Sequence, residues 1–230
     1  DIFFLSITII NIYFGFIFIK NPNFKNIFIF SLSSALAFDT RIMSVIPIFI
    51  ILLMFLLESL KNNQSLKKNL KYIIYFFPIT LFFILLFWPY VWHDPIHNLL
   101  FGISQILSTD FSITSLYMGE FILSKNAPWH YPIVWIGITS PVVIILFFLL
   151  GSSFLIKKIV SRLIVIENNS NDIWQGENEM IDIYFLSIIL LTIFLFINKG
   201  VAYDGWRLLY FIYPAIIMVA LSGIYHLNLY

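Results

Sequence analysis

The chain has 230 residues, of which 60% are hydrophobic and 11% are charged, and its formal net charge is +1. Soluble domains carry about 25% charged residues, so this composition leaves too little polar surface for a water-soluble fold. Cysteine is absent, which excludes disulfides, thiolate catalysis and cysteine-ligated metals. Lysine and arginine are scattered along the chain, so nothing indicates a nucleic-acid partner. The composition predicts an all-α polytopic membrane protein.

Apolar stretches that approach the roughly 20 residues needed to cross a bilayer core recur along the chain. The stretch from 27 to 60 is too long for one crossing, because as a single helix it would measure roughly 51 Å against a hydrocarbon core of about 30 Å. We therefore expect two helices that meet at Asp39-Thr40-Arg41, where charges interrupt the stretch. About seven spans are predicted, near 2–19, 27–38, 42–59, 72–90, 132–156, 182–198 and 208–227.

Lysines flank the 27–60 hairpin on both sides, and they orient the predicted bundle. Loops rich in Lys and Arg stay on the cytoplasmic side, so an even number of crossings separates the two flanks. The segment 157–181 then lies inside, and its acidic, Asn-rich part from 166 onward is expected to be a solvated connector. Three segments fall on the extracytoplasmic side and are expected to share one site: the turn at 39–41 and the loops 91–131 and 199–207.

The loop 91–131 contains a segment with helical periodicity. Its apolar residues recur at helical spacing between Asn98, Gln105 and Asp110. This pattern predicts a helix that lies in the membrane interface with its apolar face toward lipid. The apolar positions are Ile96, Leu99, Leu100, Ile103, Ile106 and Leu107.

Asp39 and Arg41 are the first candidate site residues. An ionisable residue between two hydrophobic helices indicates function, because its burial in lipid costs several kcal/mol. The planar guanidinium of Arg41 suits phosphate oxygens in particular. The alternative is an interfacial turn in which the two charges reach water or pair with each other.

Two aromatic segments border the long outer loop. Trp92, His93 and Asp94 follow one predicted span, and Trp129 and His130 precede the next. An interfacial belt is the usual meaning of Trp at a helix end, and Asp-Pro favours a plain turn. Sugar stacking and acid–base chemistry are the functional alternatives. A zinc site that combines these histidines is disfavoured, because no pair has the spacing of a helical zinc motif.

Asp204, Trp206 and Arg207 form the densest polar group in the chain, immediately before the last predicted span. At the mouth of a membrane cavity they could accept a hydrogen bond from a hydroxyl, stack on a sugar face and pair with a lipid phosphate, respectively. The alternative is a tight loop that only anchors the helix end.

Four stretches together resemble the polyprenol-phosphate-sugar-dependent glycosyltransferases of the GT-C superfamily, especially family 39, which includes protein O-mannosyltransferases and aminoarabinose transferases. The resemblance covers most of the chain, and its last stretch is the most specific. The stretches are Ser34-Ala35-Leu36-Ala37-Phe38-Asp39-Thr40-Arg41, Phe87-Trp88-Pro89-Tyr90-Val91-Trp92-His93-Asp94-Pro95, Trp129-His130-Tyr131-Pro132 with Ile138-Thr139-Ser140-Pro141, and Tyr203-Asp204-Gly205-Trp206-Arg207 with Phe211-Ile212-Tyr213-Pro214.

The resemblance implies an inverting transferase whose site faces the extracytoplasmic side. Because Ile, Phe, Asn and Lys are abundant relative to Gly and Ala, as in AT-rich genomes, we expect a bacterial inner membrane with the site facing the periplasm or exterior. Its partners would be membrane lipid and a polyprenyl-phosphate-linked sugar, with the acceptor left open. No cofactor is fixed, and a divalent cation stays an option. In this family a carboxylate base acts from the first outer loop, which is expected upstream of Asp1 in a longer parent protein. The base is therefore not assigned to Asp39 or Asp204.

The resemblance also suggests roles for individual side chains. Arg41 and Arg207 would hold the carrier phosphate, and Trp92, Trp129 and Trp206 would shape the sugar pocket. One departure is Leu208, which stands where family members often carry His after the Trp-Arg pair.

Two other classes of function remain open from the sequence. A transporter or lipid flippase would use buried charges and proline-interrupted helices along a pathway near the bilayer midplane. A non-catalytic membrane anchor would show no clustering of polar groups. The gathering of polar residues at one predicted face favours an enzyme supplied from the lipid leaflet.

Overall fold

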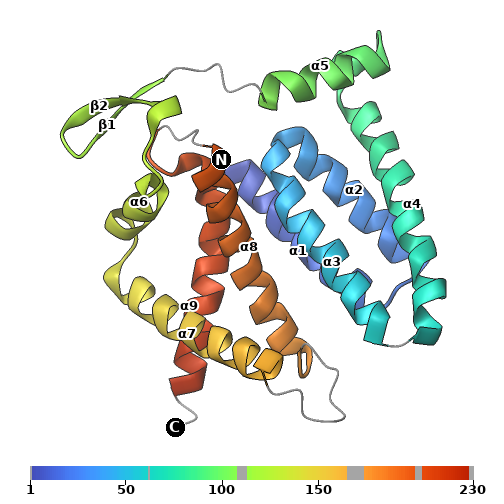
Figure 1. The fold of residues 1–230 in the computed structure, drawn as a ribbon. Helices are drawn as coiled ribbons and strands as arrows, with labels where there is room; N and C mark the ends of the chain where they lie inside the picture. The colour runs from blue at the N-terminus through green and yellow to red at the C-terminus, as the bar shows by residue number, and fades with distance from the viewer. Residues whose placement is uncertain (1, 62, 108–112, 165–173, 200–203, 228–230) are drawn as a thin grey trace. The chain divides into compact units, whose positions relative to one another are not determined.

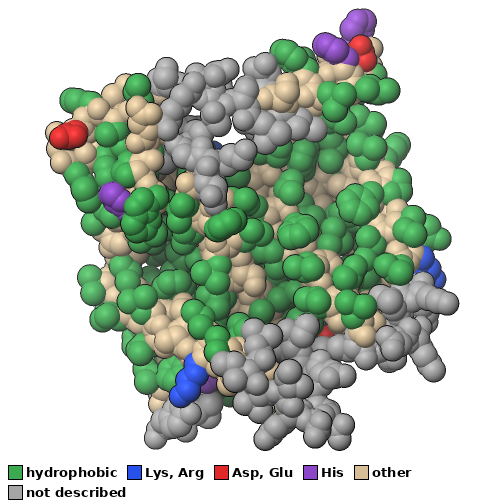
Figure 2. Space-filling model, viewed as in Figure 1, with side chains coloured by type: hydrophobic (Ala, Val, Ile, Leu, Met, Phe, Trp, Pro, Cys, Tyr) green, Lys and Arg blue, Asp and Glu red, His purple; other side chains and the backbone are tan. Residues whose placement is uncertain are grey.

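The computed structural model describes the chain except for residues 1, 62, 108–112, 165–173, 200–203 and 228–230 (Figure 1). Within the described residues, six helices have the length and hydropathy of a membrane crossing. Hydrophobic side chains cover most of the visible surface (Figure 2), as expected for a surface that faces lipid. The protein is therefore an all-α polytopic membrane protein, which confirms the class predicted from composition. Its chain divides into two compact units, Asp1–Asp110 and Phe111–Tyr230.

The first unit is a bundle of four long helices followed by a shorter one. α2 packs against α1 and α4, while α3 packs against α1 and α4. Two short 3-10 turns, Ile42–Ser44 and Pro89–Val91, follow α2 and α4. The helices are α1 (Ile2–Lys20), α2 (Phe24–Thr40), α3 (Val45–Lys61), α4 (Asn63–Phe87) and α5 (Pro95–Leu107).

The predicted division of 27–60 into two helices is confirmed. α2 ends at Thr40, and Arg41 has an extended backbone with φ −158° and ψ 133°. α2 has 17 residues and is not among the six helices long enough to count as spans, which accounts for the difference from the seven predicted. The predicted helix in the long loop is present as α5, and its position in a membrane interface stays a prediction.

Polar and small side chains join α1 to α2. The Asn11 amide of α1 donates hydrogen bonds to the hydroxyls of Ser33 (3.0 Å) and Ser34 (2.8 Å). All three residues are buried. In lipid such groups must find partners inside the protein, and small residues let two helices approach closely. The serines of α2 thus fix its pairing with α1.

The second unit begins with a β-hairpin that the sequence analysis did not predict. β1 (Thr114–Tyr117) and β2 (Glu120–Leu123) pair antiparallel. Met118 and Gly119 form the turn with φ values of +51° and +89°. Among the described residues, the short helix α6 (Tyr131–Thr139) and three longer helices follow the hairpin. The longer helices are α7 (Val142–Ile164), α8 (Glu177–Lys199) and α9 (Tyr213–Leu227).

The predicted span 132–156 is wrong as a single helix. The helix is interrupted between α6 and α7 at Ser140, which has an extended backbone with φ −91° and ψ 143°. Pro141 follows, and proline disfavours the helical conformation of the residue before it. α7 then runs from Val142 to Ile164 and is the candidate crossing.

The glycines of α7 and α9 meet face to face where these helices cross. A Cβ atom added at Gly151 would lie 2.1 Å from the Val219 oxygen, and one added at Gly223 would lie 2.4 Å from the Phe147 oxygen. Both distances are far below van der Waals contact and both end on backbone. The crossing therefore requires glycine at both positions.

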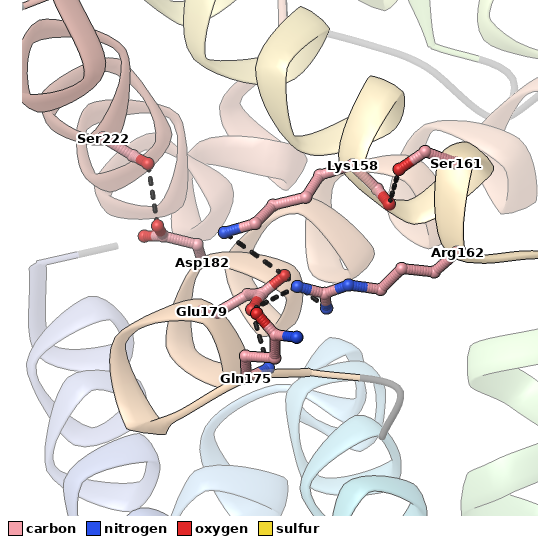
Figure 3. Close-up of polar contacts among 7 residues, drawn as sticks. All are labelled: Lys158, Ser161, Arg162, Gln175, Glu179, Asp182 and Ser222. Carbon is pink, nitrogen blue, oxygen red and sulfur yellow. Dashed lines mark hydrogen bonds and ion pairs between the residues drawn. The ribbon is translucent and has the colours of Figure 1, made fainter. Parts of the chain in front are cut away.

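An ion-pair network around the buried Glu179 joins α7 to the start of α8 (Figure 3). The Glu179 carboxylate accepts a hydrogen bond from Arg162 (2.9 Å) and one from the Gln175 backbone N–H (2.7 Å), and Lys158 lies 3.5 Å away. The prediction of a solvated connector over 166–181 is thus wrong for its last residues, because α8 begins at Glu177 and Glu179 is buried. Residues 165–173 of that connector lie outside the described residues.

A second polar contact holds α8 against α9. The Ser222 hydroxyl donates a 2.7 Å hydrogen bond to Asp182, as the close-up shows (Figure 3). Asp182 comes one turn after Glu179, so both carboxylates point from the same end of α8 toward neighbouring helices. The predicted span 182–198 therefore began at Asp182 and omitted the first turn of α8, which carries Glu177 and Glu179.

Candidate functional site

The turn from Asp204 to Arg207 leads into the last helix of the second unit. Asp204 and Gly205 have left-handed backbones, with φ +57° and +67°. Aspartate tolerates this region better than most residues, and glycine adopts it freely. The two left-handed residues reverse the chain, and Arg207 then starts the 3-10 helix η4 (Arg207–Ile212).

Hydrogen bonds fasten this turn to the hairpin and to α6. All of them come from N–H groups of the turn to hydroxyl groups elsewhere in the second unit. They run from Gly205 N to Tyr131 Oη (3.2 Å), from Trp206 Nε1 to Thr139 Oγ1 (2.7 Å) and from Asp204 N to Ser115 Oγ (3.3 Å). The hairpin and α6 therefore hold the turn in place. Both are distant from it in the sequence, and the shortest separation between bonded residues is 67 residues, from Thr139 to Trp206.

Arg207 forms an ion pair with Asp204 at the surface. The guanidinium Nη1 lies 3.1 Å from Asp204 Oδ2, and the two side chains are 56% and 61% exposed. An exposed pair of this kind contributes only about 0–1 kcal/mol. The carboxylate orients the guanidinium without burying it, so an external anion can reach Arg207.

Aromatic rings line one side of the turn. The Trp206 ring lies 5.6 Å from that of Tyr210 and 5.8 Å from that of Tyr213, between centroids. Tyr210 and Tyr213 are stacked, with an interplanar angle of 15°. Rings of this kind at a helix end sit at the membrane interface, and their faces also suit a sugar ring.

The segment 129–131 lies next to the same turn. Trp129 is exposed, and the His130 ring lies 5.8 Å from the ring of Tyr117. Tyr131, which binds Gly205, is buried and packs 4.8 Å from Tyr117. Burial, together with the neighbouring Tyr131, raises the pKa of the Tyr117 phenol above 10.0, so this group stays neutral at physiological pH.

Two of the predicted site segments, 129–130 and 204–207, are therefore brought together within the second unit. Sequence reasoning named the aromatic and charged residues and omitted the hydroxyls that hold them. Tyr131 and Thr139 lie inside quoted motifs and could have been weighed as supports. Ser115 carries no sequence signal, because it reaches the turn only through the unpredicted hairpin. Tyr203, Gly200 and the side chain of Lys199, also part of this predicted loop, lie outside what the structure describes.

Arg41 and Asp39 belong to the first unit. The Arg41 guanidinium carbon lies 5.7 Å above the ring centroid of Phe4, and Asp39 is exposed. Phe38, Trp88 and Leu99 pack around one apolar cluster. The end of α2 therefore lies at the same end of this unit as the Trp-Pro segment and α5, as the predicted topology requires.

Trp92, His93 and Asp94 are all exposed, and two of them have structural contacts. The Trp92 indole N–H donates to the Leu85 carbonyl at 2.7 Å. Asp94 Oδ1 accepts a hydrogen bond from the His97 N–H at 3.3 Å at the start of α5. Asp94 thus caps a helix, which favours the turn interpretation for this residue over an acid–base role.

Among the described residues, no group of three His, Asp or Glu side chains could hold a metal ion.

Comparison of the chain with protein-family models, with curated proteins and with solved structures finds no match. The fold and the turn define a polytopic α-helical membrane protein with a charged aromatic turn at the start of its last helix.

Proposed function

We propose that this protein is a membrane glycosyltransferase that moves a sugar from a polyprenyl-phosphate carrier to an extracytoplasmic acceptor. The observation that carries the proposal is the turn 204–207, in which an exposed guanidinium stands beside a cluster of three aromatic rings. Arginine is the side chain best suited to a phosphate, and aromatic faces suit a sugar. The turn therefore offers both halves of a lipid-linked sugar a chemically matched surface.

The chemistry assigned to the turn is binding and charge stabilisation. In an inverting transfer the acceptor hydroxyl attacks the anomeric carbon while the bond to the carrier phosphate breaks. Arg207 would stabilise the charge that develops on the leaving phosphate, and Asp204 would keep the guanidinium oriented. The base that takes the hydroxyl proton is not assigned to any residue of this chain.

Other residues extend the proposal. Arg41 is a second candidate for the carrier phosphate, and Trp92 and Trp129 are candidates for sugar contacts because both rings are exposed. His130, whose ring lies 5.8 Å from that of Tyr117 and 5.4 Å from that of Trp129, is a further candidate for sugar contacts in the second unit. The membrane would be a bacterial inner membrane, with this surface facing the periplasm or exterior.

Arg207→Ala is expected to lower transfer of a labelled polyprenyl-phosphate sugar by more than tenfold, about 1.4 kcal/mol of transition-state stabilisation or more. The assay uses membranes that contain the protein. Arg41→Ala is expected to have a similar effect. Lys157→Ala is the matched control, because it removes an exposed cation of the second unit that lies away from the turn. Turnover at the wild-type level in both arginine variants contradicts the assignment of the phosphate site.

The topology behind the proposal has its own test, helped by a chain without cysteine. Single cysteines at Asn126 and Gln175, both exposed, are expected to react with a membrane-impermeant maleimide from opposite sides of the membrane. Asn126 follows the hairpin, and Gln175 precedes α8. Labelling of both positions from one side would show that the lysine-based orientation is wrong.

The transporter or flippase alternative is favoured by one observation in the first unit. Asn11 lies in the middle of α1, and its side-chain oxygen Oδ1 is buried with no hydrogen-bond partner among the described residues. Polar groups at such a depth can line a pathway. Reconstitution into vesicles distinguishes the two functions. Movement of a labelled polyprenyl-phosphate sugar between leaflets, without transfer to any acceptor, would favour the flippase.

A further inference from the structure

The β-hairpin divides its side chains between two faces. Successive residues of a strand point to opposite sides, and the pairing of Leu116 with Phe121 and of Thr114 with Leu123 places these four residues on one face. Ser115, Tyr117 and Ile122 then occupy the other face. The second face is turned toward α6 and the turn 204–207, because Ser115 bonds Asp204 and because Tyr117 packs on Tyr131.

The first face is apolar and exposed. Leu116 is 57% exposed, Phe121 79% and Leu123 44%, and Met118 in the turn is 71% exposed. The only charged residue of the two strands, Glu120, pairs with Tyr117 and so belongs to the opposite face. The hairpin therefore presents an outer face without charge, which we call the Leu116–Leu123 face and define as Thr114, Leu116, Phe121 and Leu123.

The depth of the hairpin follows from its neighbours in the second unit. Phe196, in the last turn of the α8 crossing, packs against the Tyr117–Tyr131 cluster. Asp204, to which the hairpin is bonded, lies two residues before Trp206 and its ring cluster. Aromatic residues at the ends of crossings mark the level of the lipid headgroups. The hairpin thus sits where two candidate crossings leave the hydrocarbon core.

We propose that the Leu116–Leu123 face inserts into the bilayer at the boundary of headgroups and acyl chains. The occupant of this face is lipid, because the face carries no charge and the hairpin lies at the level where two candidate crossings end. On the neighbouring α6, Ile138 is also apolar and 67% exposed. α6 itself has nine residues, roughly 14 Å, which is too short to cross and suited to the same boundary. Lipid contact then presses the opposite face of the hairpin, with Ser115, against the turn 204–207. The proposal does not depend on glycosyl transfer.

The test uses single-cysteine variants labelled with bimane in phosphatidylcholine–phosphatidylglycerol vesicles. The decisive pair is Phe121→Cys and Glu120→Cys, which are neighbours on one strand, both exposed and on opposite faces. Lipid carrying a doxyl group near the headgroup is expected to quench bimane at Phe121→Cys at least twofold more than at Glu120→Cys. Iodide in the water is expected to show the reverse order. Leu146→Cys on α7 gives the lipid reference, and Asn126→Cys gives the water reference.

Thr114→Cys provides a second variant in case Phe121→Cys does not fold. Thr114 is polar but shares the proposed lipid face, so the doxyl lipid must quench this position as well. Equal quenching by iodide at Thr114→Cys, Phe121→Cys and Asn126→Cys would overturn the proposal in favour of an aqueous hairpin. Protection of the face from both quenchers would overturn it in favour of a protein partner or a second copy. Equal doxyl quenching at Phe121→Cys and Glu120→Cys would overturn the assignment to one face.

Discussion

Gly223→Ala is expected to lower the midpoint temperature of unfolding in detergent, because it forces α7 and α9 apart. The new methyl group would lie 2.4 Å from the Phe147 oxygen and 2.8 Å from the Gly151 nitrogen. Neither is the movable end of a side chain, so the helices themselves must separate. Overpacking of this kind costs about 1–3 kcal/mol, and the upper part of that range is expected here. Gly151→Ala should have the same effect from the other helix.

Two other glycines supply graded controls for the same substitution. Gly137 in α6 has no atom within 4 Å of an added Cβ, so Gly137→Ala should leave stability unchanged or raise it slightly. At Gly15 the three atoms nearest to the added Cβ all belong to the side chain of Ile51, which can adopt another rotamer, so an intermediate effect is expected. Equal midpoints for Gly223→Ala and Gly137→Ala would show that the α7–α9 crossing does not contribute to stability.

Glu179→Gln is expected to destabilise the protein by about 3 kcal/mol, measured by unfolding in mixed detergent micelles. The substitution removes the charge that faces Arg162 and Lys158 and keeps an oxygen that can accept from Gln175. Removal of one partner of a fully buried ion pair costs about 3–5 kcal/mol, and the low end of that range is expected here because Glu179 is buried while its cationic partners are partly exposed. Because Arg162 is only 21% exposed, water can replace the lost carboxylate only in part.

Glu177→Gln is the matched control for this change. Glu177 lies two residues earlier in the same first turn of α8 and is exposed. Its neutralisation should change stability by a few tenths of a kcal/mol, since exposed charges near a helix start contribute little. Equal losses in the two variants would mean that the α7–α8 network acts only through the general charge of the helix start.

The places where sequence reasoning failed have identifiable physical causes. The break at Ser140 was missed because the apolar residues on both sides of Thr139-Ser140-Pro141 were counted as one span, although proline disfavours a helical conformation of the residue before it. The hairpin was missed because only the first part of the loop 91–131, up to Asp110, showed a helical pattern, and strands of 4 residues are too short to give a clear pattern of their own. Glu179 was interpreted as solvated because an acidic stretch usually is, while its partners Arg162 and Lys158 come from a different helix.

A membrane environment and about seven spans could be predicted from the sequence alone, and six candidate spans are found among the described residues. Both depend on local properties, namely the length of apolar runs and the charges that interrupt them, such as those at Asp39 and Arg41. The same local signals singled out the residues of the turn 204–207. The contacts that hold that turn depend on tertiary packing. The hydroxyls of Ser115, Tyr131 and Thr139 accept hydrogen bonds from it although they are 67 to 89 residues away in the sequence. Contacts of that range depend on how helices and hairpin pack, and no local pattern encodes them.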